Sequence, residues 1–408
     1  MSRYHSYINS AKNILSVYKG DEPLSSFFKK YFSSNKKYGS KDRKQISHLC
    51  YCFFRLGKAI MNVTTEEKLL ISLFLCSIES NEILQNIKPE WNEQVEFPLD
   101  KKLLIINYSP KESLRTLLIE NVFPWKKELT EGIDHEEFSE SFFIQPDLFL
   151  RLRPGKEKIV IEKLQKAGID FKNITDSCVA LINATKADAI IELDKEALIQ
   201  DYNSQQTGIF IKSAIENLIP IAIGTEINLW DCCAGSGGKS IMAYDIDQKV
   251  KLTVSDIRES ILINLKKRFE NAGIKKYKSF VTDLTTQFPI PNSKFQIIVC
   301  DAPCTGSGTW SRTPEQLYFF DENLPAGQAG KIEEYSTLQK KIVSNVIPRL
   351  QSDGIFIYIT CSVFRKENEE VVTFIKENFH LKLKQMEVLK GYDKKADSMF
   401  IAVFEKAL

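Results

Sequence analysis

Two cysteines, Cys304 and Cys361, are of the right type and in the right place for nucleophilic chemistry. Each follows an apolar run typical of a buried strand, Phe295–Cys300 and Gly354–Ile359. A single cysteine at a strand end is more often a small buried hydrophobe than a nucleophile. Two of them at strand ends, where open parallel sheets collect ligands, favour covalent chemistry on a bound substrate.

A glycine-rich turn lies upstream of both cysteines. In Leu229–Ser240 an apolar strand ends at Asp231, and the turn then opens a helix. Glycines let the backbone approach a ligand closely, and a helix N-terminus offers unpaired N–H groups. The turn is not a phosphate-binding Walker loop, because a cysteine stands where the first glycine belongs. Such turns also serve as plain connections, so the turn alone does not establish a binding site.

Aspartates at successive strand ends strengthen this interpretation. Asp231, Asp256, Asp283 and Asp301 each follow a predicted strand. An acidic residue after the second strand commonly binds the hydroxyl groups of a ribose. Any one of them could instead cap a helix, but the series beside one glycine-rich turn predicts a nucleoside cofactor.

Composition restricts the remaining possibilities. The chain has 408 residues, of which 43% are hydrophobic and 26% charged, typical of an ordinary soluble protein. We expect no membrane span, no secretory leader and a cytoplasmic location, since no apolar run is long enough for the first two. Nine scattered cysteines and four dispersed histidines predict neither disulfides nor a metal site. We expect a monomer.

Charge is distributed unevenly. Residues 1–60 hold 12 Lys and Arg against 3 Asp and Glu, whereas residues 61–140 hold 8 against 16. A concentrated basic segment is the electrostatic signature of a phosphate-rich partner, although it could also be a solvated helical face.

The pattern of elements predicts three parts. Residues 1–135 read as helices, with a cap expected at Ser40 and the start of another helix at Thr65. Residues 136–200 read as a small α+β module, with strands at Phe142–Leu152 and Cys178–Asn183 around a helix. Residues 201–408 alternate strands with helices, which predicts an α/β Rossmann-like domain with a mostly parallel sheet.

The motifs together resemble the RsmB/Sun family of RNA cytosine-5 methyltransferases. The resemblance is strong over residues 141–408, and residues 1–130 are more weakly similar to the family's NusB-like helical RNA-binding domain. It rests on the glycine-rich turn, the aspartate series, Asp301–Cys304, Leu338-Gln339, Thr360–Ser362 and Glu367–Glu369. Gly235-Ser236 replaces the family's usual Ala-Pro, so we expect altered loop rigidity rather than lost binding.

The resemblance implies a role for each site residue and S-adenosyl-L-methionine as cofactor. Cys361 would attack carbon 6 of cytosine, Cys304 would assist proton removal and release, and Asp301 would contact the ring edge or bridge cofactor and base. Asp256 would bind the ribose and Asp283 the adenine. The methionine end would lie in a cradle formed by Cys233, Ala234, Gly235, Ser236, Gly237, Gly238 and Lys239.

Cytosine in RNA, first of all in small-subunit (16S) ribosomal RNA, is the substrate that the resemblance implies. The base would have to be single-stranded or flipped out of its stack. Trp310, Phe319 and Phe320 could stack on it, but each is more often a packing residue. The alternatives are a transfer-RNA methyltransferase and an RNA-binding assembly factor that has lost activity. DNA methylation is disfavoured by the Thr360-Cys361 site.

Overall fold

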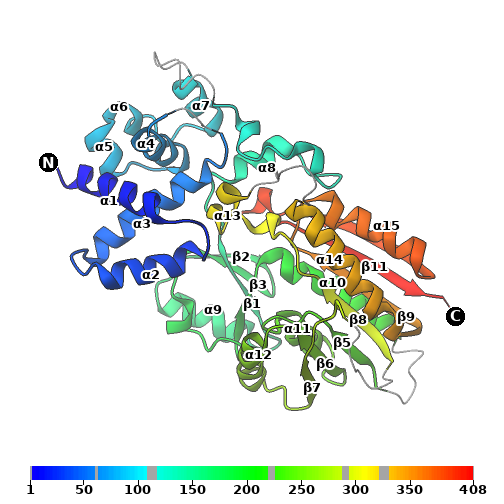
Figure 1. Ribbon diagram of the computed structural model, residues 1–408. Coiled ribbons are helices and arrows are strands. Elements are labelled where there is room, and N and C mark those ends of the chain that lie inside the picture. The colour runs from blue at the N-terminus through cyan, green and yellow to red at the C-terminus, as the bar shows by residue number, and fades with distance from the viewer. Residues whose placement is uncertain are drawn as a thin grey trace. The chain divides into compact units, whose positions relative to one another are not determined.

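The computed structural model describes residues 2–59, 63–107, 117–218, 226–286, 294–320 and 330–407. The chain divides into two compact units (Figure 1). The first, here called the helical unit, comprises Met1–Leu129, Asp134–Gln145 and Thr309–Asp321. The second, here called the sheet unit, comprises Thr130–Ile133, Pro146–Gly308 and Glu322–Leu408. The segment that follows the Cys304 motif therefore belongs to the helical unit.

Short amphipathic helices build the helical unit. They are α1 (Arg3–Val17), α2 (Leu24–Ser34), α3 (Ser40–Arg55), α4 (Thr65–Cys76), α5 (Glu82–Ile87), α6 (Pro89–Asn92), α7 (Leu99–Asn107), α8 (His135–Ser141) and α13 (Pro314–Phe319). The buried Arg55 of α3 joins distant segments, because its guanidinium donates to the backbone oxygens of Phe142 and Ser311. These bonds offset the cost of burying a charged group, because both terminal nitrogens of the guanidinium find acceptors.

The cap expected at Ser40 lies one residue earlier, whereas the helix start expected at Thr65 is confirmed. α3 begins at Ser40, and its cap is Gly39, whose N–H donates to the Asp42 carboxylate at 2.9 Å. α4 begins at Thr65, and Thr64 and Glu67 form a reciprocal capping box. In both cases the cap occupies the residue before the first helical one.

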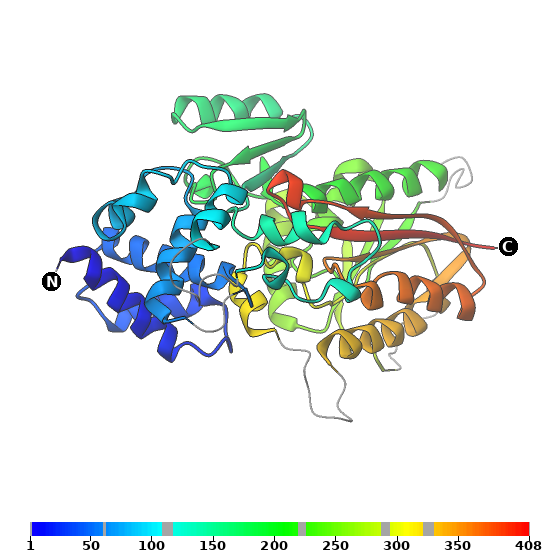
Figure 2. The same cartoon turned by 90° about the horizontal axis from the view of Figure 1, so that it is seen from above.

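A four-stranded antiparallel sheet with one helix forms the small α+β module. Its strands are β1 (Leu148–Leu152), β2 (Phe171–Thr175), β3 (Cys178–Leu181) and β4 (Ala197–Ile199), in the order β2-β3-β1-β4. Figure 2 shows α9 (Glu157–Lys166) along one face, where Val160 and Leu164 pack on the sheet.

The predicted strand Phe142–Leu152 is wrong in its first half. β1 starts only at Leu148, and Phe142 directly follows α8. The ring of Phe142 packs against those of Phe123 and Phe138 in the aromatic core of the helical unit. Tertiary packing therefore overrides the local strand preference of an apolar run.

A seven-stranded sheet is the centre of the sheet unit. It contains β5 (Asn228–Asp231), β6 (Lys251–Asp256), β7 (Tyr277–Val281), β8 (Phe295–Asp301), β9 (Leu350–Thr360), β10 (Leu381–Leu389) and β11 (Met399–Lys406). The strand order is β10-β11-β9-β8-β5-β6-β7. The five strands from β9 to β7 pair in parallel, whereas β11 is antiparallel to β9 and β10. The predicted α/β class with a mostly parallel sheet is confirmed.

Alternate residues of the strands face two separate cores. Ile297 and Val299 of β8 pack into one core with α10 (Tyr202–Leu218), α11 (Gly238–Ile246) and α12 (Glu259–Ala272). Ile298 and Cys300 face the other core, with α14 (Lys331–Val346) and α15 (Glu369–Asn378). A strand covered on both faces is apolar throughout, which is why β8 reads as an unbroken apolar run. Among the described residues no helix is long and apolar enough to cross a membrane.

Candidate active site

The two cysteines meet at the carboxyl edge of the parallel sheet. Cys304 follows β8 and Cys361 directly follows β9, and their Sγ atoms lie 3.2 Å apart. Both thiols are partly buried. The hydrogen bond with Cys361, together with burial, raises the pKa of Cys304 well above its usual value. Cys304 therefore holds its proton and can donate it toward Cys361.

One buried carboxylate holds the two cysteine loops together. Glu367 accepts from the N–H and hydroxyl of Thr305 at 2.9 and 2.5 Å, and from the hydroxyl of Ser362 at 2.6 Å. Gln339 of α14 donates both to Glu367 and to the backbone oxygen of Pro303, each at 3.0 Å. Burial raises the pKa of Glu367 even though these bonds favour its charged form. The position of each thiol thus depends on residues next to it in sequence and bonded to Glu367.

A close backbone contact fixes the Cys361 loop on its other side. The N–H of Gly308 donates to the backbone oxygen of Cys361, and Ser398 donates to Gly308. A Cβ atom at Gly308 would lie 2.1 Å from the backbone oxygen of Ser398. Glycine is required here because the two backbones approach too closely for a side chain.

The glycine-rich turn has the geometry of a ligand cradle. Gly235 and Gly237 have φ values of 53° and 85°, in the left-handed region that favours glycine. A Cβ at Gly237 would meet Phe269 at 2.7 Å, whereas the space around the Cβ position of Gly235 is open to 4 Å. Gly237 therefore serves packing, and Gly235 leaves the outer side of the turn accessible.

Asp256 ends β6, and its carboxylate is hydrogen-bonded to the glycine-rich turn. Its carboxylate accepts from the N–H of Gly235 at 3.0 Å and from the N–H of Arg258 at 2.9 Å. Asp283 lies two residues beyond β7, where the hydrogen bonds of Thr285 lower the pKa of its carboxyl group. Both aspartates lie at the same carboxyl edge as the turn, as the strand pattern predicts.

Asp301 and Lys239 form an ion pair at this edge, with Lys239 Nζ 2.6 Å from Asp301 Oδ2. Burial acts to lower the pKa of Lys239, but the charge and hydrogen bond of Asp301 outweigh it and the pKa is raised. Asp231, buried beneath the turn, accepts from Ser240 at 2.6 Å, and burial raises its pKa to about 7. The arrangement offers a fixed positive charge and a carboxylate beside two thiols.

Comparison with known proteins identifies the domain. Residues 221–404 match the family model of the 16S rRNA methyltransferase RsmB/F. This segment is similar to the RsmB/F methyltransferases. Ribosomal RNA small subunit methyltransferase B of Photorhabdus laumondii is 28% identical over 229 residues, 54% of this chain and 48% of that protein. A probable enzyme of the same name from Bacillus subtilis is 25% identical over 250 residues, 60% and 52%. The chain thus spans about half the length of these two relatives, and 33% of the one from Yersinia enterocolitica.

Solved structures share the fold. The crystal structure of PH0851 is similar with a TM-score of 0.67 and 18% identity, covering 99% of this chain and 98% of that one. NSun6 from Pyrococcus horikoshii, solved with SFG, has a TM-score of 0.54 and 14% identity, covering 67% and 94%. At such identities the likeness extends to the fold alone.

The matched segment stabilises its glycine-rich turn through a cation. Arg268 of α12 donates to the backbone oxygen of Ser236 at 3.0 Å and to its hydroxyl at 2.7 Å, and also pairs with Asp194 at 2.8 Å. A tethered serine thus restricts the turn where the family usually has a proline. Sequence reasoning missed Arg268, because nothing in its helix distinguishes it from a solvated arginine.

Three further thiols of the matched segment lie close together. The sulfur atoms of Cys232, Cys233 and Cys300 lie within 4.8 Å of one another and are of a type that could hold a metal ion. Cys232 and Cys300 are fully buried and belong to the core around Trp230. The sequence predicted no metal site, and that expectation stays a prediction.

The aromatic residues suggested for base stacking lie elsewhere. Trp310 and Phe320 are 1% and 5% exposed, and both pack against Trp125 in the helical unit. Phe319 packs against Tyr18 and Phe54 of the same unit. Stacking of a target base on Trp310 or Phe320 is therefore wrong, and the packing interpretation holds. Gln339 and Glu367, quoted in the motifs but given no role, are the positioning residues that the sequence missed.

Proposed function

We propose that this chain is an RNA cytosine-5 methyltransferase that uses S-adenosyl-L-methionine and acts on small-subunit ribosomal RNA. One observation supports this most strongly. The thiols of Cys304 and Cys361 lie 3.2 Å apart at the edge that also carries Asp301 and Lys239. A reaction that needs one thiol to add to a ring and a second group to assist its release requires such a pair.

The cofactor fits the residues of the turn. Open space over Gly235 and the carboxylate of Asp256 behind it suit a ligand with a ribose and a polar chain. Asp256 would hold the ribose, Asp283 the adenine, and Cys233 to Lys239 the methionine end. When bound, the cofactor supplies an electrophilic methyl group on a sulfonium.

The two thiols would have different roles in the covalent chemistry. The Cys361 thiolate would form a bond to carbon 6 of cytosine, and the electron pair of the 5,6 double bond would shift to carbon 5, which could then displace the methyl group from the sulfonium and leave a neutral thioether. A base then removes the proton from carbon 5, the double bond re-forms, and the carbon–sulfur bond to Cys361 breaks. Cys304, 3.2 Å from Cys361, would assist both steps: its thiol would pass its proton to the departing Cys361 sulfur, and the Cys304 thiolate so formed would take up the proton from carbon 5. The positive charge of Lys239, fixed by Asp301, stabilises the negative charge on the ring.

An RNA substrate is supported by charge and by the relatives. Residues 1–60 carry 12 Lys and Arg against 3 Asp and Glu, although the whole chain has a net charge of only +2. Such a local excess attracts phosphates. The matched relatives from Photorhabdus laumondii and Bacillus subtilis are named as ribosomal RNA small subunit methyltransferases.

Covalent trapping tests the proposal. Wild type, Cys304→Ala and Cys361→Ala are incubated with labelled cofactor and either small-subunit ribosomal RNA or transfer RNA. We expect a persistent protein–RNA adduct on denaturing gels with Cys304→Ala and none with Cys361→Ala. Bisulfite sequencing of both RNAs identifies the modified cytosine and its RNA class.

The buried Cys178 of β3 supplies the control, because Cys178→Ala also removes one thiol but lies in the small module. It should methylate RNA like the wild type without a trapped adduct. An adduct with Cys361→Ala would reverse the two roles, and unchanged methylation in both variants would refute covalent catalysis by this pair. Absence of cofactor binding in calorimetry would favour the inactive assembly factor instead.

A further inference from the structure

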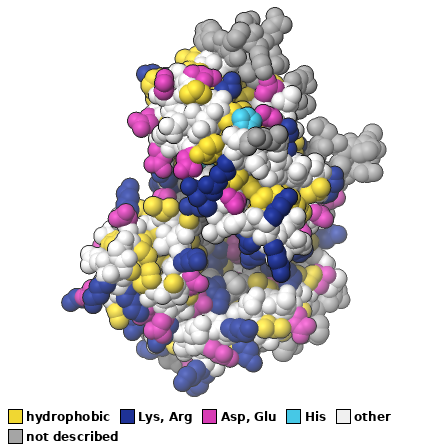
Figure 3. Space-filling model, turned by 90° about the vertical axis from the view of Figure 1, so that its left-hand side faces the viewer, with side chains coloured by type: hydrophobic (Ala, Val, Ile, Leu, Met, Phe, Trp, Pro, Cys, Tyr) yellow, Lys and Arg dark blue, Asp and Glu magenta, His cyan; other side chains and the backbone are white. Residues whose placement is uncertain are grey.

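Arg268 of α12 is held from two directions. Its Nε lies 2.8 Å from the carboxylate of Asp194, and its Nη1 donates to the backbone oxygen and the hydroxyl of Ser236 at 3.0 and 2.7 Å. The Arg268 side chain is only 22% exposed. On the face drawn in Figure 3, by contrast, Lys and Arg side chains are spread over the surface with Asp and Glu among them. Arg268 therefore connects two segments instead of serving as a solvated charge.

Ser236, one of the two partners of Arg268, occupies the most adaptable part of the glycine-rich turn. It lies between Gly235 and Gly237, whose φ values are 53° and 85°. Two glycines give a free turn many conformations, of which a ligand selects one. A proline between them would restrict the turn through its ring, which fixes φ. In this chain the two bonds from Arg268 hold the same position instead.

Asp194, the other partner of Arg268, belongs to the small α+β module and precedes β4. Its N–H donates to the backbone oxygen of Ala197 at 2.8 Å, and its own backbone oxygen accepts from Arg153 at 3.1 Å. These bonds hold a φ of 66°, which is uncommon for a residue other than glycine. The carboxylate that orients Arg268 is thus positioned by the fold of the module.

We propose that Asp194 and Arg268 are positioning residues for the cofactor, and that through them the small module sets how tightly the glycine-rich turn binds S-adenosyl-L-methionine. The carboxylate fixes the guanidinium, and the guanidinium fixes Ser236. A turn that is already ordered loses less entropy when a ligand binds, so its affinity is higher. The inference rests on the proposed function and adds a link between the module and the cofactor.

The family's Ala-Pro sequence provides a test by rescue. Arg268→Gln removes the tether, and Gly235→Ala combined with Ser236→Pro replaces it with a ring. Calorimetry measures the cofactor Kd of each protein and of the combination. We expect Arg268→Gln to weaken binding about 10-fold in the natural turn but less than about 2-fold in the Ala-Pro turn, because the ring already imposes the order. An equal loss in both turns would overturn the positioning role.

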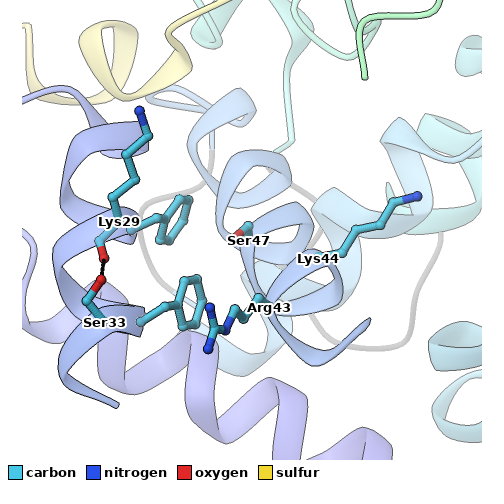
Figure 4. A pocket seen from close by; sticks show the side chains of 7 residues that line it. Lys29, Ser33, Arg43, Lys44 and Ser47 are labelled. Atoms are coloured by element: carbon cyan, nitrogen blue, oxygen red, sulfur yellow. Dashed lines mark hydrogen bonds between the residues drawn. The ribbon is translucent and has the colours of Figure 1, made fainter. Parts of the chain in front are cut away.

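Asp194→Asn tests the link to the module even if the Ala-Pro turn fails to bind the cofactor. It should weaken cofactor binding about 3-fold in the wild type and have no further effect beside Arg268→Gln, because it acts through that arginine. Arg43→Gln is the control. Arg43 lies in the pocket between α2 and α3, where its Nε donates to Tyr38 and its guanidinium lies 5.9 Å from the ring centre of Phe32 (Figure 4). This variant should keep the cofactor Kd of the wild type.

Hydrogen exchange provides a measurement that does not depend on methylation. Because coupling between two sites is reciprocal, saturating cofactor should slow exchange of the Asp194 amide in the wild type but not in Arg268→Gln. An amide that exchanges equally with and without cofactor in the wild type would overturn the link. If the wild type methylates RNA while Asp194→Asn and Arg268→Gln bind cofactor as tightly as it does, only this inference falls. If the wild type binds no cofactor, the proposed function falls with it.

Discussion

At the scale of single residues, the positions of the two cysteines depend on a carboxylate that touches neither sulfur. Glu367 bonds to Thr305 and Ser362, the residues that directly follow Cys304 and Cys361. Two loops from different strands are thereby tied to one point. In the sequence Glu367 stands in an ordinary acidic stretch, and only the fold makes it the link between the two thiols.

Substitution of Glu367 should therefore misplace both thiols. Glu367→Gln keeps one acceptor oxygen but loses the second, which accepts from the Thr305 N–H and from Gln339. Glu367→Ala loses all four bonds. We expect kcat to fall on the order of 100-fold in the alanine variant and less in the glutamine variant, since small displacements of reacting groups are costly. Methyl-transfer kinetics at saturating RNA measure this.

Glu370, in the next helix turn, is the matched control. It forms only a long 3.8 Å contact with Arg365 and is 41% exposed. Glu370→Ala should retain kcat. A Glu367→Ala protein with normal kcat and normal reactivity of Cys304 toward a thiol reagent would contradict the positioning role.

At the scale of elements, unbroken apolar runs made the central strands of the sheet predictable. The apolar runs Phe295–Cys300 and Gly354–Ile359, predicted to be strands, lie within β8 and β9. Short or half-exposed elements were missed, namely β2 and β4, because they lack a long apolar run. Contacts between elements, such as those of Arg268 with the turn, lie beyond any local pattern.

One such contact joins the small module to the methyltransferase domain. Arg151 of β1 and Arg153, which directly follows β1, both pair with Asp245 near the end of α11, at 2.7 and 2.6 Å. The Asp245 side chain is only 6% exposed. Two arginines also offset the unfavourable placement of a negative charge at a helix C-terminus.

Asp245→Asn should destabilise the sheet unit, because it leaves two largely buried guanidinium groups without their counter-charge. Breaking a buried ion pair in this way costs about 3–5 kcal/mol. Urea unfolding followed by circular dichroism measures the change. Glu216→Gln, which removes an exposed partner of Lys212 on α10, should cost less than about 0.5 kcal/mol. Equal free energies of unfolding for the two variants would show that the ion pairs of Asp245 do not stabilise the contact between the small module and the rest of the sheet unit.

At the scale of the whole molecule, the segment Thr309–Asp321 leaves the Cys304 loop and completes the helical unit. It does so through Trp310 and Phe320, which pack on Trp125, and through the bond from Arg55 to Ser311. The sequence left contact with the substrate open for these aromatics, although it favoured packing. Composition could not decide, because an aromatic residue after an active-site motif suits either role until its packing partners are known.

The uneven distribution of charged residues along the chain predicts where RNA contacts it. Residues 1–60 hold 12 Lys and Arg against 3 Asp and Glu, and residues 61–140 hold 8 against 16, within one largely helical stretch. Phosphates should be attracted to the first segment and repelled by the second. Photocrosslinking of the full chain to thiouridine-labelled ribosomal RNA, followed by peptide mapping, should give several-fold more crosslinks in residues 1–60 than in 61–140. The excess should shrink at high salt, because exposed charges are screened. An even distribution, or one unaffected by salt, would mean that shape or base contacts rather than charge guide the RNA.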